Sequence, residues 1–478
     1  MSNTSQSLAG KRICGLLDEN SFVEIGANVT ARSTDFNMQQ TETPGDGVIT
    51  GYGVIAGRLV YVYSQDASVL GGTIGEMHAK KITALYDMAM KMGAPVIGLL
   101  DCAGLRLQEA TDALNAFGEI YQKQAMASGV VPQIAAVFGR CGGGLALVPA
   151  LADFTFMEGS SAELFVNTPN ALAGNTKEKC NTASAEFQSA EAGLVDFVGS
   201  EDEILSQIRE LVDLLPSNNE DDSQYQECTD DLNRVCTDLA NALGDPAVLA
   251  ADLADGHNFL EVKKDYAKDM VTGFIRLNGA TVGVVANRTE LYDEEGNTAE
   301  TFDCALSAKG ALKAAEFVNF CDAFEIPVLS VTNVEGFKAS KCTEKRIAKA
   351  AAKLTYAFAN ATVPKVNVIT GKAFGSAYVA MNSKAVGADV TFAWSQAQIG
   401  MMEPQLAAKI MYGNESATVI NEKAAEYAAL QSSAMAAARR GYVDTVIEAE
   451  DTRKYVIGAF EMLFTKREDR PSKKHGTV

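Results

Sequence analysis

One strand-like stretch occurs twice in the sequence: Pro95-Val-Ile-Gly-Leu-Leu-Asp101, which closes at Gly104, and Pro327-Val-Leu-Ser-Val-Thr-Asn333, which closes at Gly336. In the second copy, Pro327 takes the place of Pro95 and Asn333 that of Asp101. Four further pairs follow in the same order: Thr50-Gly51 with Thr272-Gly273, Pro132–Gly139 with Pro364–Gly371, Ala152-Asp153 with Ala388-Asp389, and Gly193–Asp196 with Gly441–Asp444. Glycine-rich strand ends look alike in many α/β proteins, which would explain one or two matches but not five in one order. We therefore predict an internally duplicated chain.

The two copies divide the chain into halves near residues 30–210 and 260–460. Within each half, short β-branched runs alternate with Ala-rich stretches such as 79–92 and 345–360, which is typical of repeated β-α units in an α/β layered fold. Polar, turn-forming residues follow Pro216 and indicate a linker. We therefore expect an N-terminal domain over residues 1–215, a linker over 216–259 and a C-terminal domain over 260–478.

Composition and charge exclude several classes of protein. Of the 478 residues, 47% are hydrophobic and 21% are charged, as in a globular protein and unlike a disordered or collagen-like chain. The 61 acidic and 41 basic residues give a net charge of −20, which disfavours binding to nucleic acid or anionic lipid. Nine cysteines without a Cys-x-x-Cys pair, and three histidines, argue against a disulfide framework and a histidine-rich metal site. No apolar run of about 18 residues and no secretory signal are visible, so we expect a cytoplasmic protein.

The strongest local signal for chemistry is the glycine-rich run Gly139-Arg-Cys-Gly-Gly-Gly-Leu-Ala-Leu147, which follows a strand-like run and precedes a helix-compatible one. The first N–H groups of a helix have no partner within it and can hold an anion or a developing oxyanion. The run lacks the Gly-Lys-Ser/Thr of a phosphate-binding loop, and close strand–helix packing would explain its glycines equally well. In the second copy, Gly375 and Ser376 take the places of Gly143 and Gly144. One chain therefore offers two equivalent amide-donor turns, as an enzyme that stabilises two enolate-like oxygens would need.

Other candidates have a structural as well as a chemical interpretation. Four carboxylates could be general acids or bases, although such residues are as often caps or ion-pair partners: Asp101, Glu109, Glu335 and Glu403. The pair Lys80-Lys81 could contact phosphates, but lysines on a helix more often lie on a solvated face. Cys102 and Cys141 have no histidine nearby in the sequence, and we interpret them as small packing residues.

Several motifs together are similar to one known family. They are Gly45-Asp-Gly-Val-Ile-Thr-Gly-Tyr-Gly-Val-Ile-Ala-Gly-Arg58, Ser64-Gln-Asp66, Gly71-Gly-Thr-Ile-Gly-Glu-Met-His-Ala-Lys-Lys81, Ala361–Val366 and Lys473-Lys-His-Gly476. Over nearly its whole length the chain resembles the carboxyltransferase (β) subunits of biotin-dependent acyl-CoA carboxylases of the acetyl-/propionyl-CoA carboxylase type. It equally resembles the α subunits of methylmalonyl-CoA and glutaconyl-CoA decarboxylases. The resemblance implies two tandem crotonase-like (ClpP/crotonase) β-β-α superhelix domains, and a homohexamer whose active sites lie between the N-terminal domain of one subunit and the C-terminal domain of another.

The resemblance also implies a reaction and its residues. A carboxyl group would move between carboxybiotin, carried by a separate protein, and the α-carbon of a short-chain acyl-CoA. Gly143 and Gly144 would hold the thioester enolate oxygen, while Ser376 and Ala377 would hold the biotin ureido oxygen. The biotin enolate would remove the α-proton, so that neither a side-chain base nor a metal is required. The other substrate-binding positions implied are Ala103, Gly104, Leu105, Arg106, Cys141, Gly375 and Val379.

The implied partners are the biotin carboxyl carrier protein and a biotin carboxylase or, for the reverse reaction, a membrane decarboxylase β subunit. The sequence leaves the direction open. Departures from the family pattern cluster in the second half, at residues 334–347, 371–373 and 402–406. A non-catalytic scaffold with a degenerate second site is therefore an alternative. A crotonase-type hydratase is a third, and it would need two carboxylates converging on the acyl-CoA side.

One short motif would instead suggest that this chain carries biotin itself. Ala89-Met-Lys-Met92 spells the tetrapeptide around the biotin-bearing lysine of carrier domains, where that lysine lies at the tip of an exposed hairpin. Here the stretch 78–92 is rich in Ala, Met and Leu and predicts a helix. We therefore expect biotin to arrive on a partner and not on Lys91.

Overall fold

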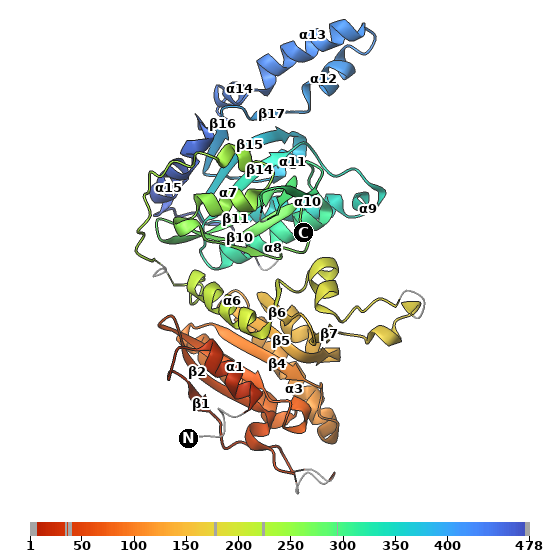
Figure 1. Cartoon of the computed structure of the whole chain (residues 1–478), viewed down its shortest axis with the longest axis vertical. Coiled ribbons are helices and arrows are strands. Elements are labelled where there is room, and N and C mark those ends of the chain that lie inside the picture. Colours follow the sequence, from red (N-terminus) through yellow and green to blue (C-terminus); the bar gives the residue numbers. More distant parts are fainter. Residues whose placement is uncertain are drawn as a thin grey trace. The chain divides into compact units, whose positions relative to one another are not determined.

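The computed structural model describes residues 7–33, 36, 41–175, 179–221, 225–293 and 295–473. Its internal contacts divide the chain into two units, residues 1–223 and 224–478, which we call unit 1 and unit 2 and describe separately (Figure 1). Part of the segment expected to be a linker belongs to unit 2, because helix α7 (Pro246–Leu253) buries Leu249 and Leu253 in its core. The domain boundaries drawn from the sequence stay a prediction.

Unit 1 is built on an eight-stranded sheet with the order β1-β2-β3-β4-β5-β6-β8, and β7 pairs with the end of β5. Strands β1, β2 and β3 are antiparallel, and the strands from β3 to β8 are parallel. The bounds are β1 Val23–Ile25, β2 Val48–Ile55, β3 Arg58–Gln65, β4 Val96–Cys102, β5 Gln133–Gly142, β6 Phe154–Glu158, β7 Glu163–Phe165 and β8 Phe197–Gly199.

Unit 2 repeats this sheet strand for strand. Its order is β9-β10-β11-β14-β15-β16-β18, and β17 pairs with the end of β15. The bounds are β9 Phe259–Val262, β10 Met270–Leu277, β11 Ala280–Asn287, β14 Val328–Val334, β15 Lys365–Phe374, β16 Val390–Trp394, β17 Gln398–Gly400 and β18 Thr445–Ile447. A separate ribbon pairs β12 (Glu290–Tyr292) with β13 (Thr298–Thr301). The predicted duplication is therefore confirmed, as is the prediction of an α/β fold with two sheet domains.

The two sheets also share local geometry. The turns Ala56-Gly57 and Asn278-Gly279 both have φ values of 50° and 78°, which identifies type I′ hairpin turns in which glycine is favoured at the second position. In each sheet the long central pair of parallel strands shifts register near its end. Beyond that shift Cys102 faces Cys141 in unit 1, and Val334 faces Ala373 in unit 2. On its other edge, the central strand pairs first with β6 or β16 and then, at its end, with a short additional strand, β7 or β17.

Helices cover both faces of each sheet (Figure 1). In unit 1, α1 and α6 contact each other and the sheet, and α2 packs against β2, β3 and α3. In unit 2, α8 packs against β10, β11 and α10, while α7 contacts β9, β10 and β11. The remaining helix bounds are α1 Leu8–Leu16, α2 Glu76–Met92, α3 Ala110–Ala127, α4 Leu147–Ala150, α6 Glu201–Leu214, α8 Ala308–Ala323, α9 Lys341–Glu344, α10 Ile347–Asn360, α11 Gly375–Ala380, α12 Pro404–Met411, α13 Ala417–Tyr427, α14 Ala434–Ala438 and α15 Thr452–Leu463.

Helix α2 contains the biotin-like tetrapeptide and the lysine pair. Lys91 lies in its last turn, so the prediction of a helix there is confirmed. Lys80 is exposed and pairs with Glu76 at 2.6 Å. The expectation of a solvated face is wrong for Lys81, which is buried and whose ammonium donates to the carbonyls of Gly45 and Val48. Unpaired carbonyls at the start of β2 need a donor, and a lysine from the covering helix supplies it.

Unit 2 has a buried lysine in the equivalent position. Lys313 on α8 takes the place of Lys81 in the repeat, at the spacing that also relates Pro327 to Pro95. It is 2% exposed and donates to the carbonyls of Lys263, Tyr266 and Met270 at 2.7–2.9 Å. Burial lowers the pKa of Lys81 to about 8 and that of Lys313 to about 7. The duplication therefore preserved a buried amine as well as a backbone.

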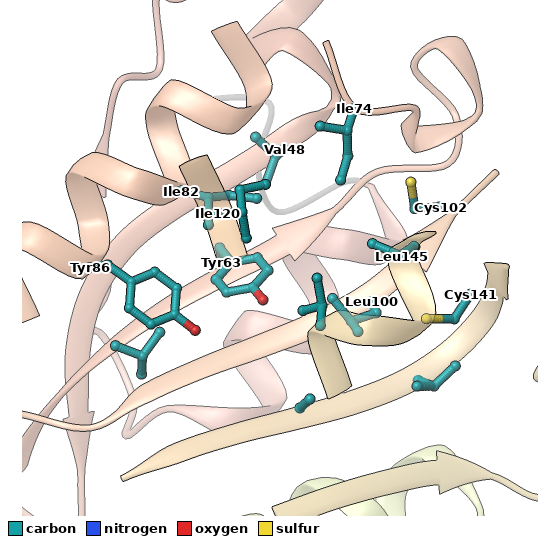
Figure 2. Close-up of a cluster of buried hydrophobic side chains, with 14 of the residues drawn as sticks. Val48, Tyr63, Ile74, Ile82, Tyr86, Leu100, Cys102, Ile120, Cys141 and Leu145 are labelled. Atoms are coloured by element: carbon teal, nitrogen blue, oxygen red, sulfur yellow. The ribbon is translucent and has the colours of Figure 1, made fainter. Parts of the chain in front are cut away.

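The core of unit 1 lies between the sheet and helices α2 and α3. Figure 2 shows Val48, Tyr63, Ile82, Tyr86 and Ile120 packed over the strands, with Cys102, Cys141 and Leu145 at the end where β4 and β5 stop. In unit 2 the core includes Trp394, the single tryptophan of the chain, whose indole N–H donates to Thr452 Oγ1 at 2.9 Å. Among the described residues, no helix combines the length and the apolar character needed to cross a bilayer.

Candidate active site

The glycine-rich run of unit 1 forms a sharp turn from β5 into a helix. Gly143 has φ 65° and begins a short 3-10 turn, Gly143–Ala146, which continues into α4. A Cβ on Gly143 would have no heavy atom within 4 Å, so this glycine is needed for its left-handed backbone and opens onto free space. The N–H groups of Gly143 and Gly144 stand at the start of this turn, where a helix leaves its donors without internal partners.

A cavity of about 700 Å³ lies in front of this turn. The end of β4 with the loop after it, one face of α3 and the turn itself line it, together with Arg140 of β5 and Phe165 of β7. The lining includes the predicted positions Ala103, Gly104, Leu105, Gly143 and Gly144. Its other lining side chains are mostly apolar, with Arg140 at the exposed rim. An apolar cavity with a few convergent backbone donors is typical of a site for a small organic molecule.

Two aromatic residues of α3 line the cavity and were not singled out in the sequence. Tyr121 donates its hydroxyl to the carbonyl of Gly144 at 2.6 Å, and its ring stacks on Phe117 with centroids 5.7 Å apart. The hydroxyl therefore ties the donor turn to the helix that faces it. Their i, i+4 spacing is a signal that could have indicated a shared face of a helix.

Arg106 lies behind the cavity rather than in its lining. Its guanidinium, 1% exposed, pairs with Asp46 and with Glu109 at 2.9 Å, and donates to the carbonyl of Thr73 at 2.7 Å. Burial raises the pKa of Asp46, although the charge of Arg106 opposes that shift. The structure therefore places Arg106 where its side chain fixes the loop 102–107 from behind.

His78 belongs to the same buried cluster. Its Nδ1 donates to the carbonyl of Asp46 at 2.9 Å, and its Nε2 lies 3.3 Å from the amide nitrogen of Gln65. Burial lowers the pKa of His78 to about 3, and nearby Arg106 adds to that shift. A neutral, enclosed imidazole holds the backbone in place and does not exchange protons with the cavity.

The two cysteines at the strand ends are packing residues, as interpreted from the sequence. Cys102 and Cys141 are 1% and 0% exposed and belong to the unit 1 core. Burial raises the pKa of Cys102 to about 12 and that of Cys141 well above its usual value. Burial therefore favours the neutral form of both thiols. Cys102 also borders the cavity, whereas Cys141 is not among the lining residues.

The candidate carboxylates all have structural partners. Asp101 pairs with Arg12 at 3.1 Å, Glu109 with Arg106, and Glu335 with Lys372, while Glu403 accepts the N–H of Leu406 at the start of α12. Within the described part of the chain, no Asp or Glu lines the cavity. The hydratase alternative needed two carboxylates there, so the site does not favour it. Nor does any group of three His, Cys, Asp or Glu residues, among those described, converge as metal ligands would.

The second glycine-rich run forms the same turn in unit 2. Gly375 has φ 63° and begins α11 directly after β15. Ser376 follows, Ala377 is buried, and Val379 is 40% exposed. The ion pair of Lys372 with Glu335 lies at the strand ends beside this turn, and the hydrogen bond that Lys372 donates to Glu335 raises the pKa of Lys372. The two units therefore have equivalent donor turns with different neighbouring residues: an apolar cavity in unit 1 and the Lys372–Glu335 ion pair in unit 2.

Two tandem α/β domains, each with a glycine turn at the end of its central strand, define an internally duplicated α/β protein. The carboxyl transferase domain family matches residues 3–478, and the chain belongs to that family. It is 42% identical, over 98% of its length and 93% of the relative's, to the propionyl-CoA carboxylase beta chain of Roseobacter denitrificans. It is 39% identical, over 98% and 92%, to the methylmalonyl-CoA decarboxylase subunit alpha of Propionigenium modestum. The predicted family membership is confirmed.

A solved structure agrees with these relatives. The chain matches the hexameric transcarboxylase 12S, with hydrolysed methylmalonyl-coenzyme A bound, at a TM-score of 0.91 and 35% identity. The match covers 98% of this chain and 92% of the transcarboxylase chain.

Proposed function

We propose that this chain is the carboxyltransferase component of a biotin-dependent acyl-CoA enzyme. It moves a carboxyl group between carboxybiotin, on a separate carrier protein, and the α-carbon of a short-chain acyl-CoA. The observation that carries the proposal is the pair of donor turns at Gly143 and Gly375, with φ values of 65° and 63° at equivalent strand ends.

Unit 1 is assigned to the acyl-CoA. The apolar cavity accepts the acyl group and the thioester, and the N–H groups of Gly143 and Gly144 donate to the thioester oxygen. As the α-carbon loses a proton or a carboxyl group, negative charge moves onto that oxygen. One such donor contributes roughly 3 kcal/mol to transition-state stabilisation in sites of this kind. Backbone donors held by the turn need no rearrangement during the reaction.

Unit 2 is assigned to biotin. A ureido oxygen needs donors of the same geometry, and the start of α11 at Gly375, Ser376 and Ala377 offers backbone N–H groups of this kind. A Cβ on Gly375 would lie 3.3 Å from the carbonyl of Met401, so a side chain at this position would crowd the turn. When bound, biotin supplies the carried carboxyl group and a basic ureido group. The cavity residues of unit 1 supply no base, since the nearby His78 and carboxylates are enclosed or paired.

The direction of the reaction, the partners and the assembly belong to the same proposal. Relatives of about equal identity include a carboxylase beta chain and a decarboxylase alpha subunit. The partner is accordingly a biotin carboxylase with its carrier, or a membrane decarboxylase subunit. The hexameric transcarboxylase supports a homohexamer. All nine cysteines are free thiols, which accords with the reducing conditions of the cytoplasm.

An exchange assay tests the function. The purified chain is incubated with free biotin and a panel of acyl-CoAs, and carboxyl transfer is followed from malonyl-CoA and methylmalonyl-CoA. We expect biotin-dependent loss of carboxyl from at least one of them. Absence of transfer from every member, with acyl-CoA binding intact by calorimetry, would instead identify the non-catalytic scaffold.

A further inference from the structure

The matched helices α3 and α10 differ sharply in surface charge. Their buried faces correspond in a single register: Ala113, Ala116, Ile120, Gln124 and Ala127 match Ile347, Ala350, Leu354, Phe358 and Ala361 in that order, and all ten are buried. A second contact supports this register. The Gln133 side chain donates to the carbonyl of Gln124, and Lys365 donates to that of Phe358. The two helices can therefore be compared position by position.

Four exposed positions change from acidic or neutral to basic. In unit 1 they are Thr111, Asp112, Asn115 and Glu119. In unit 2 the matched residues are Lys345, Arg346, Lys349 and Lys353, which we call the basic stripe. In the described part of the chain, Lys345, Arg346 and Lys353 form no ion pair. The change is confined to the outer face, because the buried face keeps its pattern.

The stripe stands out against the charge of the whole chain. The protein has a net charge of −20, and unit 1 alone has 28 acidic and 13 basic residues. An acidic partner is repelled by most of this surface and attracted where the positive charge is concentrated. Lys349 and Lys353 lie on α10, and Lys345 and Arg346 directly precede it. Helix α10 packs against α11, which begins at Gly375, so the stripe belongs to the segment beside the second donor turn (Figure 1).

We infer that the basic stripe is the docking surface for an acidic protein domain that brings biotin to the turn at Gly375. This inference rests on the proposed function. A small substrate needs a cavity, such as the one in unit 1, whereas a group delivered on a protein also needs a surface to hold its carrier. The charge differs between matched helices because the two turns receive their substrates in these two ways.

The test replaces the stripe with the residues that unit 1 has at the matched positions: Lys345→Thr, Arg346→Asp, Lys349→Asn and Lys353→Glu. The matched control, Lys345→Arg, Lys349→Arg and Lys353→Arg, keeps the charge. The probes are free biotin and a biotinylated carrier domain of an acyl-CoA carboxylase, chosen for its net negative charge. We expect the KM for the carrier to rise at least about 10-fold in the exchanged variant. Its activity with free biotin stays unchanged, and the arginine variant behaves as the unmodified chain.

Three results would overturn the inference. They are an unchanged KM for the carrier, a rise confined to the KM for acyl-CoA, which would assign the stripe to the phosphates of coenzyme A, and a loss of assembly by light scattering, which would assign it to a second copy of the chain. If the exchanged variant does not fold, the salt dependence of the unmodified chain tests the inference instead. Its kcat/KM for the carrier should fall steeply as salt rises from about 0.05 to about 0.5 M, while kcat/KM for free biotin stays level. Inactivity of the unmodified chain with free biotin would instead reject the proposed function.

Discussion

Glycine is favoured at position 143 because of its backbone conformation. Its φ of 65° is open to glycine and costly for other residues, while the space around it would admit a side chain. The position therefore separates two effects that are usually mixed, the presence of an N–H group and the conformation that aims it.

We predict that Gly143→Pro lowers kcat for biotin-dependent carboxyl transfer about 100- to 1,000-fold. Proline removes the N–H and holds φ negative, so both the donor and the turn are lost. The control is Gly143→Ala, which keeps the N–H at a conformational cost of about 1 kcal/mol and should retain most of the activity. Circular dichroism reports folding. Near-normal rates in a folded proline variant would contradict the assignment of this turn.

Tyr121 offers a gentler test of the same turn. We predict that Tyr121→Phe lowers kcat by about 5- to 10-fold, the effect of losing one hydrogen bond of about 1 kcal/mol, with little change in the KM for acyl-CoA. The ring and its stacking on Phe117 remain, so only the 2.6 Å bond to the Gly144 carbonyl is lost. Tyr52→Phe serves as the control. A rise in KM without a fall in kcat would show that Tyr121 contacts substrate and does not position the donors.

At the scale of the helix, the buried lysines fix how each covering helix meets its sheet. Lys81 and Lys313 each reach across from the helix to carbonyls at the start of an antiparallel strand. A carbonyl without a donor in such a place costs about 1–3 kcal/mol. The amine thus sets the position of the helix along the sheet.

We predict that Lys313→Met destabilises unit 2. The loss in free energy of unfolding, relative to the unmodified chain, grows as pH rises from 7 to about 10. Burial holds the pKa of Lys313 at about 7 in the folded chain, below its ordinary value of 10.5. Between these values the unfolded chain binds more protons at this site, so the stability contributed by Lys313 increases with pH. Urea denaturation at several pH values measures the difference from the unmodified chain, with the exposed Lys264→Met as control. A constant difference across that range would contradict the prediction.

Elements and turns followed from the sequence because they depend on local chemistry. The repeated strands and the donor turn at Gly143 impose short-range requirements that residue types reveal. The burial of Lys81 and the place of Arg106 behind the loop could not be predicted, because both depend on carbonyls and carboxylates that are distant in sequence. The cavity walls from α3 were missed for the same reason: Phe117 and Tyr121 become lining residues only when α3 faces the turn after β5.

At the scale of the whole molecule, each chain carries one donor turn of each kind. The proposed reaction needs both substrates at one place, and the family resemblance assigns the two turns of a single active site to different subunits. We predict that light scattering of the active protein gives a mass several times 50.7 kDa, with a hexamer as the expected state. A fully active monomer of 50.7 kDa would contradict this arrangement.

The burial of Trp394 has a practical consequence for measurement. The chain has one tryptophan, and it is enclosed in unit 2 with its N–H bonded to Thr452. Tryptophan fluorescence, excited near the red edge of protein absorption, therefore reports on unit 2 alone. Unit 1 contains no tryptophan and does not contribute to that emission. Comparing that emission with circular dichroism, which sees both units, would show whether the duplicated halves unfold together or one after the other.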